Sequence, residues 1–370
     1  MSVRTSPWNT SGPARSLGDG QRPGAPGRER TDESPQLAWE RLVGAGLHDV
    51  LVAPEAGGRG GSVTVAAGDV ADVAAGDLVG ALILAGHHAG IAALRAGGPA
   101  TAAIQEGIRR DGRRLSPAVA TTSALTITPR EGGHGLRGTA APVHGANAAQ
   151  GFVAIARNGD GVPWVVAVPA ERPGSVVDDL SQRAGLRRLP AGSVQFLDTP
   201  TQADEAVALA DGAPSPEALN RGLQALFAAA AAVGAARGSV DAAASLTRER
   251  PRPRPVPGAT SAITDPIGQV VIGGAFGPIE AAHALVLEVA DEFAAALDGP
   301  GAPVGTDALP ARALAALDTA LEVALNQGEQ VFEIVGTSGS GNAHGFDALW
   351  RDIRTLSLLW PRAERRRAIG

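Results

Sequence analysis

The stretch that says most about the fold is residues 328–361, GEQVFEIVGTSGSGNAHGFDALWRDIRTLSLLWP, which is the least repetitive part of a chain rich in Ala, Gly and Val. It predicts a helix, a break of small residues over 336–342, and a second helix. The second helix repeats its apolar residues about every 3.6 positions, as one helix face does; they are Phe346, Leu349, Trp350, Ile353 and Leu356. The break exposes backbone N–H groups and allows a ligand to approach closely. The stretch is therefore either a plain helical hairpin or a hairpin whose turn faces an anion, with Arg351 and Arg354 beside it.

Composition narrows the class of protein. The 370 residues are 44% hydrophobic and 3% aromatic, with a net charge of −6, no Cys and no Lys. This length allows two or three domains or one large subunit. No clustered basic face is present, so nucleic-acid binding is not expected, and without Cys there is no disulfide or thiolate chemistry. No uncharged apolar run reaches the ~18 residues of a membrane span, and the N-terminus has no apolar signal core. We expect a cytoplasmic protein with no membrane partner.

The composition and the hydrophobic pattern divide the chain into four regions. Residues 1–34 are rich in Ser, Gly, Pro and Arg and predict a disordered leader. Residues 35–112 predict an N-terminal α domain. Residues 113–212 alternate Thr or Ser with apolar residues and contain the turn sequence NGDG at 158–161, which predicts a middle antiparallel β domain. Residues 213–370 return to helix and predict a C-terminal four-helix bundle. The fold class is therefore α+β.

Four ordered segments of this chain resemble the acyl-CoA dehydrogenase superfamily. They look most like its flavin-dependent monooxygenase branch, typified by the dibenzothiophene monooxygenases. The resemblance extends loosely over residues 35–361. The segments are FEIVGTSGS…HGFDALWRDIRT (332–355), DPIGQVVIGG…IEAAHALV (265–286), GHHAG (86–90) and GTAAPVHGANA (138–148).

The resemblance implies a homo-oligomer, a dimer or a tetramer, that binds FAD or FMN between the β domain and the C-terminal helices. It places two residues, Thr121 and Thr122, on the pyrimidine side of the flavin. It places His144 and Gly145 where the family has a Ser-Gly that faces the flavin. Near the phosphate or nucleotide portion it places Gly336, Ser338 and Arg351. Small residues permit close backbone approach, and Arg pairs well with phosphate oxygens.

The implied chemistry is monooxygenation of a small organic substrate by reduced flavin and O₂, in secondary metabolism or another biosynthesis. A separate flavin reductase would supply the reduced flavin. His88 takes the position of a helix histidine that points into the cavity of relatives. His88 and His144 are the candidate catalytic residues, because an imidazole can protonate or stabilise an oxygen intermediate. Because His87 and His88 are adjacent on one helix, we expect at most one of them to point inward.

The chain also departs from the family pattern. The branch carries two histidines near its C-terminus where this chain has Leu356 and Leu359, and small residues replace bulky aromatics at 140–143. An alternative is therefore a flavin-free descendant with a non-redox catalytic, binding or scaffolding role. Acyl-CoA dehydrogenase activity is disfavoured, because the usual Glu base would fall around Leu359 or Trp360. No histidine has metal-ligand spacing with acidic partners, so no metal is expected.

Overall fold

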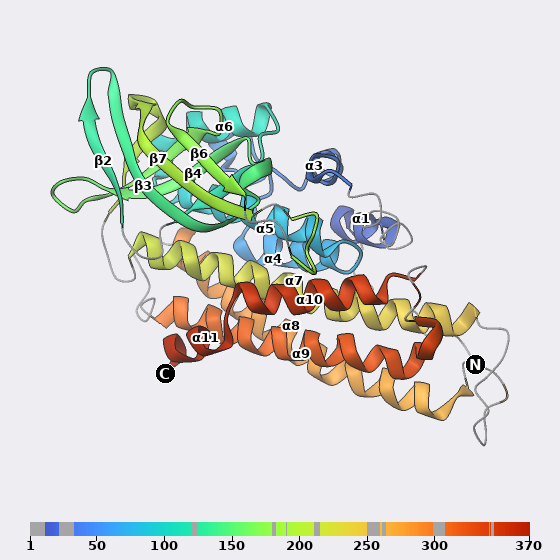
Figure 1. Ribbon diagram of the computed structural model, residues 1–370. Coiled ribbons are helices and arrows are strands. Elements are labelled where there is room, and N and C mark those ends of the chain that lie inside the picture. Colours follow the sequence, from blue (N-terminus) through green and yellow to red (C-terminus); the bar gives the residue numbers. More distant parts are fainter. Residues whose placement is uncertain are drawn as a thin grey trace.

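Helices come first, a sheet follows, and long helices complete the chain (Figure 1). The computed structural model describes residues 12–21, 33–119, 124–179, 183–189, 191–210, 215–249, 260, 264–298, 308–339, 341 and 344–370. The sheet lies at one end of the molecule, and the long C-terminal helices lie at the other (Figure 1). The N-terminal helices α4 (Val63–Ala74) and α5 (Leu78–Arg95) lie between them, so the junction of all three parts is close to α5.

The N-terminal helices begin at side-chain caps that the sequence supplies. Ser62 accepts a hydrogen bond from the N–H of Val65 and starts α4, while Asp77 accepts one from the N–H of Gly80 and starts α5. α5 is buried almost all round, because α4, α3 (Pro35–Gly44), α7 (Pro216–Glu249) and strand β1 (Leu115–Ala118) all pack against it. The helical elements of this region are α3 (Pro35–Gly44), η2 (Pro54–Ala56), α4 (Val63–Ala74), α5 (Leu78–Arg95), η3 (Gly98–Thr101) and α6 (Ala102–Arg110).

Part of the predicted disordered leader is ordered, which corrects that expectation. Residues Pro13–Gln21 form helix α1, which packs on α4. Arg15 is nearly buried and pairs with Asp72 at 4.0 Å and Asp241 at 3.6 Å. A Cβ on Gly18 would lie 2.2 Å from the carbonyl oxygen of Asp72, so only glycine allows this approach. Ala14 and Leu17 add apolar contacts with the core to these ion pairs and the backbone contact, but two residues are too few to show a helical apolar period in the sequence.

The middle region is one eight-stranded sheet with the order β6-β7-β3-β2-β4-β5-β8, and β1 pairs with β4 off this path. The two hairpins expected from Gly-containing turns are present as β2–β3 and β4–β5. The pairs β1–β4 and β2–β4 are parallel, so the sheet is mixed and not purely antiparallel as predicted. The strands are β1 (Leu115–Ala118), β2 (Leu125–Arg130), β3 (Gly133–His144), β4 (Gly151–Arg157), β5 (Pro163–Pro169), β6 (Ser175–Asp179), β7 (Ala191–Gln202) and β8 (Ala206–Ala208).

The turn between β4 and β5 has a physical cause in its sequence. The side-chain oxygen of Asn158 accepts hydrogen bonds from the N–H groups of Asp160 and Val162, at 3.0 and 2.9 Å. Gly161 has φ 81°, a conformation that glycine adopts without strain. Two short 3₁₀ turns complete the region, η4 (Ala146–Ala148) and η5 (Ala203–Glu205).

The C-terminal region is built on four long helices and a short last one. Asp265 caps the second of them through the N–H of Ile267, at 3.0 Å, as the Asp-Pro pair predicts. Gly336, at φ 59° and ψ −157°, interrupts the third near its end, so the predicted break begins there. Trp350 is 43% exposed, which corrects its placement on the buried stripe. The helices are α7 (Pro216–Glu249), α8 (Pro266–Asp298), α9 (Leu309–Gly339), α10 (Phe346–Leu359) and α11 (Arg362–Ile369).

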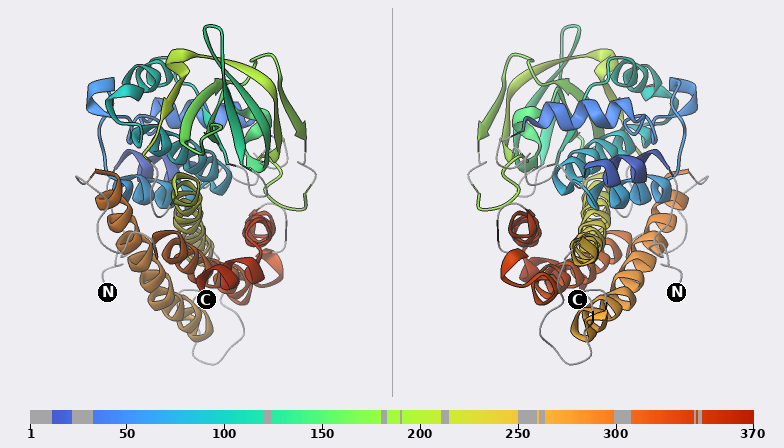
Figure 2. Two further views of the ribbon diagram at one scale, coloured as in Figure 1. Left: turned by 90° about the vertical axis from the view of Figure 1, so that its left-hand side faces the viewer. Right: turned by 90° about the vertical axis from the view of Figure 1, so that its right-hand side faces the viewer.

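Three helices are long and apolar enough, by length and composition alone, to cross a membrane: Leu78–Arg95, Pro216–Arg248 and Pro266–Leu297. The apolar windows of the first two are 89% and 94% buried inside the protein, so α5 and α7 are core helices. The window of α8 is only 22% buried. α8 lies on the outer side of the bundle, opposite α10 (Figure 2). Its inner face packs on α4, α7 and α9, but the exposed apolar side chains of its outer face, Ile267 and Val270, have no cover within the described chain.

Candidate active site

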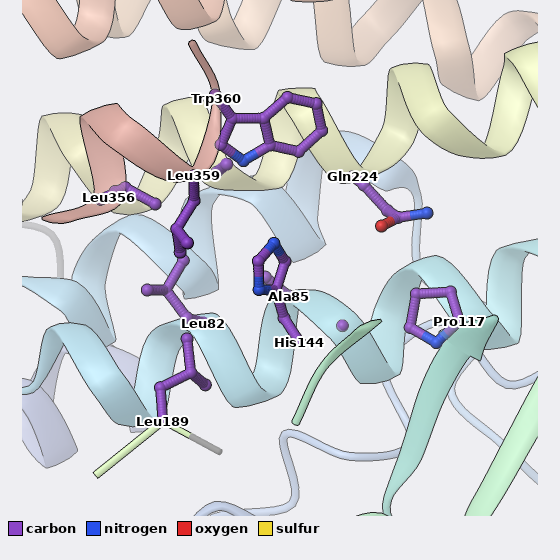
Figure 3. Close-up of a pocket in the computed structure, with 11 residues that line it drawn as sticks. Leu82, Ala85, Pro117, His144, Leu189, Gln224, Leu356, Leu359 and Trp360 are labelled. Atoms are coloured by element: carbon purple, nitrogen blue, oxygen red, sulfur yellow. The ribbon is translucent and has the colours of Figure 1, made fainter. Parts of the chain in front are cut away.

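A cavity lies where the sheet, the N-terminal helices and the C-terminal helices meet (Figure 3). The space between its walls is about 460 Å³, a figure that includes open solvent at its mouth. Two of its lining side chains, His144 and Gln224, carry hydrogen-bonding groups on opposite walls, and the indole N–H of Trp360 adds a third. The lining residues are Leu82, Ala85, Gly86, Pro117, His144, Leu189, Gln224, Ala228, Leu356, Leu359 and Trp360.

His144 is the last residue of β3, and its ring points into this cavity (Figure 3). The ring makes no hydrogen bond within the described chain, and its Nδ1 is buried. Burial, with a contribution from the nearby Arg183 guanidinium, lowers the pKa of His144 to about 4. The imidazole is therefore neutral at pH 7, with one nitrogen able to donate a proton and the other able to accept one.

Gly145 follows His144 and has φ 81°, in the left-handed region. A Cβ at this position would lie 3.1 Å from the hydroxyl oxygen of Ser116. That hydroxyl donates to the carbonyl of His144 and so joins the end of β3 to β1. The glycine thus lets the chain turn sharply at the cavity rim and hold His144 there.

His87 and His88 are both fully buried, so the expectation that at most one would point inward is wrong. The physical reason is that α5 is covered on nearly every side. The Nε2 of His87 lies 2.8 Å from the carbonyl of His48, and its Nδ1 accepts from the N–H of Leu115 at 3.3 Å. Burial lowers the pKa of His87 to about 3. His87 is a satisfied structural residue that joins three segments.

His88 packs against Phe227 of α7, with ring centroids 5.8 Å apart. Neither of its ring nitrogens has a hydrogen-bond partner within the described residues. Burial, then the neighbouring His87, lowers its pKa well below the usual value. His88 does not line the cavity, although Ala85 and Gly86 of the same helix do. The structure therefore brings only one of the two candidate catalytic histidines to the cavity surface, and the role of His88 stays a prediction.

The predicted cofactor residues are spread over several places. Thr121 and Thr122 fall outside the described residues. Gly336 lies in the interrupted part of α9, and Ser338 follows it, with an undescribed side chain. Arg351 donates to the carbonyl of Ala184 at 2.7 Å and pairs with Asp347 at 3.1 Å, so its guanidinium is already engaged within the chain. The binding roles of these residues remain predictions.

The end of α10 forms one wall of the cavity. Leu356 and Leu359, the two positions where the resemblance leads us to expect histidines, both line it together with Trp360. Behind this wall, Arg365 of α11 is 4% exposed and donates to the carboxylate of Asp318 at 2.6 Å and to the carbonyl of Trp360. The helix that follows α10 is thereby tied to α9, and Trp360 is held in place.

Gln224 was not among the residues predicted from the sequence. It lies on α7 one turn after Asn220, and its side-chain N–H donates to the Asn220 oxygen at 2.9 Å. The sequence did contain a sign of this pair, because Asn220 and Gln224 are two amides spaced i, i+4 near the start of a helix that is otherwise rich in Ala and Leu. Trp360 was also missed as a lining residue, because it follows the last turn of α10 and no helix period reaches it.

Comparison with known proteins assigns this architecture to a class. Residues 226–358 match the family model described as "Acyl-CoA dehydrogenase, C-terminal domain". A dibenzothiophene monooxygenase of Rhodococcus qingshengii is 28% identical over 380 residues, 93% of this chain and 88% of that protein. Another, of Rhodococcus erythropolis, is 29% identical over 252 residues, 63% of this chain and 60% of that protein.

Solved structures show the same fold. FMN-bound TdsC, a dibenzothiophene monooxygenase from Paenibacillus sp. A11-2, superposes with a TM-score of 0.84 at 24% identity, covering 97% of this chain and 95% of that one. Methanesulfinate monooxygenase MsuC from Pseudomonas fluorescens has a TM-score of 0.82 at 21% identity, covering 99% and 96%. XiaF from Streptomyces sp., solved with FADH₂, has a TM-score of 0.74 at 16% identity, covering 97% and 93%.

The chain thus has the acyl-CoA dehydrogenase fold, as the sequence predicts. Its curated relatives and solved neighbours are flavin-dependent monooxygenases of that fold, so the predicted resemblance is confirmed.

Proposed function

We propose that the protein is a flavin-dependent monooxygenase that uses reduced flavin and O₂ on a small organic substrate bound in the cavity of Figure 3. One observation carries the proposal. The end of β3, with His144 and Gly145, faces α5, α7 and the end of α10 across this cavity, in a fold whose solved neighbours hold FMN or FADH₂. A protein of this kind needs a source of reduced flavin, so we also propose a separate flavin reductase as a partner.

The residues at the sheet side of the cavity fit a flavin ring. Pro117 and the neutral imidazole of His144 line the cavity there, and the left-handed turn at Gly145, directly after His144, holds that ring at the cavity. The positive charge of Arg183 lies close enough to lower the pKa of that imidazole, and it would favour the electron-rich end of a reduced ring system. FAD and FMN share this ring, so the fit supports either.

Bound reduced flavin would supply the electrons that activate O₂. The chain would contribute three things. The apolar wall of Leu356, Leu359 and Trp360 would exclude water from the reacting atoms. The imidazole of His144, neutral at working pH, would donate a hydrogen bond from one ring nitrogen to a developing oxygen anion and so stabilise its charge. The opposite wall, with Gln224, would orient the substrate.

The test is an anaerobic titration of the purified protein with chemically reduced FMN and FAD, followed by admission of O₂ and product analysis. We expect flavin to bind. For His144→Ala we expect binding to be retained and oxygenated product per flavin consumed to fall by about 10²-fold or more, with hydrogen peroxide released instead. The control is His134→Ala, at the other end of β3, where the ring packs on Trp164 and product yield should be unchanged. Absence of any flavin binding would sink the proposal.

A flavin-free descendant of the fold is the second candidate, with a non-redox catalytic, binding or scaffolding role. It is favoured by the contacts of Arg351, whose guanidinium is bound to Ala184 and Asp347 instead of facing open space. It is also favoured by leucine at the two family histidine positions that line the cavity. The same titration separates the two candidates, because a flavin-free protein would show no change in flavin absorbance at any protein concentration.

We propose further that the protein is a homo-oligomer, a dimer or a tetramer, that covers the outer face of α8 with a second copy of the chain. Val270 is 74% exposed and Ile267 is 44% exposed on this helix. Gly273, Gly274 and Gly277 would present no obstacle to a close helix, because added Cβ atoms there would meet nothing within 4 Å. An apolar helix face of this kind marks an interaction surface.

Light scattering after size-exclusion chromatography tests the assembly. The wild type should run as a dimer or tetramer, and Val270→Asp should shift it toward the monomer. Val162→Asp, at a 39% exposed position in the β4–β5 hairpin, is the matched control and should leave the mass unchanged. A wild type that is monomeric, or that associates only with detergent or lipid, would refute a second copy as the cover. Cell fractionation tests the cytoplasmic location that we propose for the protein.

A further inference from the structure

Gln224 occupies the cavity wall opposite His144, and its amide orientation is determined by a chain of hydrogen bonds. The chain begins at the backbone carbonyl of Ala89 in α5, which can only accept. Asn220 therefore donates its side-chain N–H to it, at 2.8 Å. The side-chain oxygen of Asn220 is then the acceptor for the N–H of Gln224, at 2.9 Å. The anchoring carbonyl thus removes the usual ambiguity between the oxygen and nitrogen of both amides.

The consequence is that the side-chain carbonyl of Gln224 remains for a ligand. No hydrogen bond of this oxygen is present within the described residues, and Gln224 lines the cavity. In Figure 3 the oxygen lies on the side of the amide toward His144, while the nitrogen points away from it. Asn220 is 2% exposed, so the hydrogen-bonded pair is anchored in the interior. A buried network that is satisfied in this way holds its last member in one orientation.

We propose that Gln224 is a specificity-determining residue that accepts a hydrogen bond from an N–H or O–H group on an otherwise apolar ring substrate. An apolar ligand without a donor would remove water from this carbonyl and leave it unpaired, whereas a ligand with a donor replaces the lost hydrogen bond. Dibenzothiophene, the compound in the names of the relatives, carries no such donor, whereas indole, held in solved structures of TdsC, does. The inference deepens the proposed function and rests on the same cavity.

The test compares two ring compounds of nearly equal shape, indole, which has an N–H donor, and benzofuran, which has an acceptor oxygen in its place. Binding to the purified full-length protein is measured by equilibrium dialysis without flavin or O₂. We expect the wild type to bind indole about tenfold more tightly than benzofuran, the factor that one net hydrogen bond supplies.

Gln224→Leu should weaken indole binding about tenfold, leave benzofuran binding unchanged or tighter, and so abolish the selectivity. Gln224→Glu keeps an acceptor oxygen at the same reach and should retain the preference for indole. Gln36→Leu makes the same substitution at an exposed helix position outside the cavity and should behave as the wild type. Circular dichroism confirms that each variant is folded.

Equal binding of the two probes by the wild type, selectivity that survives in Gln224→Leu, or binding of neither probe would each overturn the inference. Its failure is distinguishable from failure of the proposed function, because the dialysis contains no flavin. A protein that binds and turns over flavin but shows no selectivity loses only the inference about Gln224. A protein that selects indole but binds no flavin loses only the monooxygenase assignment.

Discussion

The burial of His87 predicts a specific loss of stability in acid. In the folded protein its pKa is lowered to about 3, first by burial, although the hydrogen bond to the carbonyl of His48 acts in the opposite direction. In the unfolded chain the pKa returns to about 6.5. Below pH 6.5 the unfolded state therefore binds a proton that the folded state does not, and the free energy of unfolding falls as the pH is lowered until about pH 3.

The size of the effect follows from the two pKa values. Between pH 7 and pH 5, protonation of His87 stabilises the unfolded state relative to the folded state. This lowers the free energy of unfolding by about 2 kcal/mol from His87 alone. This is a substantial fraction of the roughly 5–15 kcal/mol of a typical folded protein. His88 and the half-buried His144 shift in the same direction and add to the total acid sensitivity of the wild type.

The assay is urea unfolding of the wild type and of His87→Gln at pH 7 and pH 5, at one fixed protein concentration. The variant is expected to be less stable at pH 7, because one or both hydrogen bonds of His87 are lost. Its further loss between pH 7 and pH 5 should be about 2 kcal/mol smaller than that of the wild type. If both proteins lose the same amount, His87 is not the buried neutral group described here, and the argument from burial fails.

Two other predictions concern packing and ion pairs. Gly234→Ala should destabilise the protein by about 1–3 kcal/mol in thermal or urea unfolding, because a Cβ there would lie 2.0 Å from a carbonyl oxygen of α4. Gly107→Ala, in α6, where an added Cβ would meet nothing within 4 Å, should instead be neutral or stabilising by up to about 1 kcal/mol, and equal effects would contradict the close packing. Asp318→Asn should cost about 3 kcal/mol because it leaves the buried Arg365 guanidinium without its charged partner. Glu322→Gln, in the exposed pairs beside it, should cost under about 1 kcal/mol in the same assay, and a similar loss in both would contradict that reading.

Much of the secondary structure was accessible from the sequence because its causes are local. A 3.6-residue apolar period, the Asp-Pro start of α8 and the Asn-Gly turn at 158–161 act within a few residues of themselves. The two hairpins and the long helices were predicted on that basis and are present. The parallel pairing of β1 and β2 with β4 was not predicted, because strand partners far apart in the chain leave no local pattern.

The burial of individual side chains was harder to predict from the sequence than the helices and strands. A helix period assumes one buried and one exposed face, and α5 has no exposed face, so both of its adjacent histidines are buried. Trp350 has the period of a core residue but lies at the edge of the stripe, where it is 43% exposed. α1 carries no apolar period and is held by the ion pairs of Arg15 and by a glycine contact, so its composition resembled that of a disordered leader.

The sequence by itself predicted the order of helices and strands and the resemblance to the acyl-CoA dehydrogenase superfamily, because both depend on residue patterns within short segments. It also identified His144 and Gly145 as candidates through a matched segment. Only the tertiary structure decided that His144 reaches a cavity while His88 does not. It also decided that the amide of Gln224 faces His144 across that cavity, because this depends on a backbone carbonyl in α5 that is 131 residues away from Asn220 in the chain. Hydrogen-bond networks that cross between helices are set by packing, and packing has no local signature.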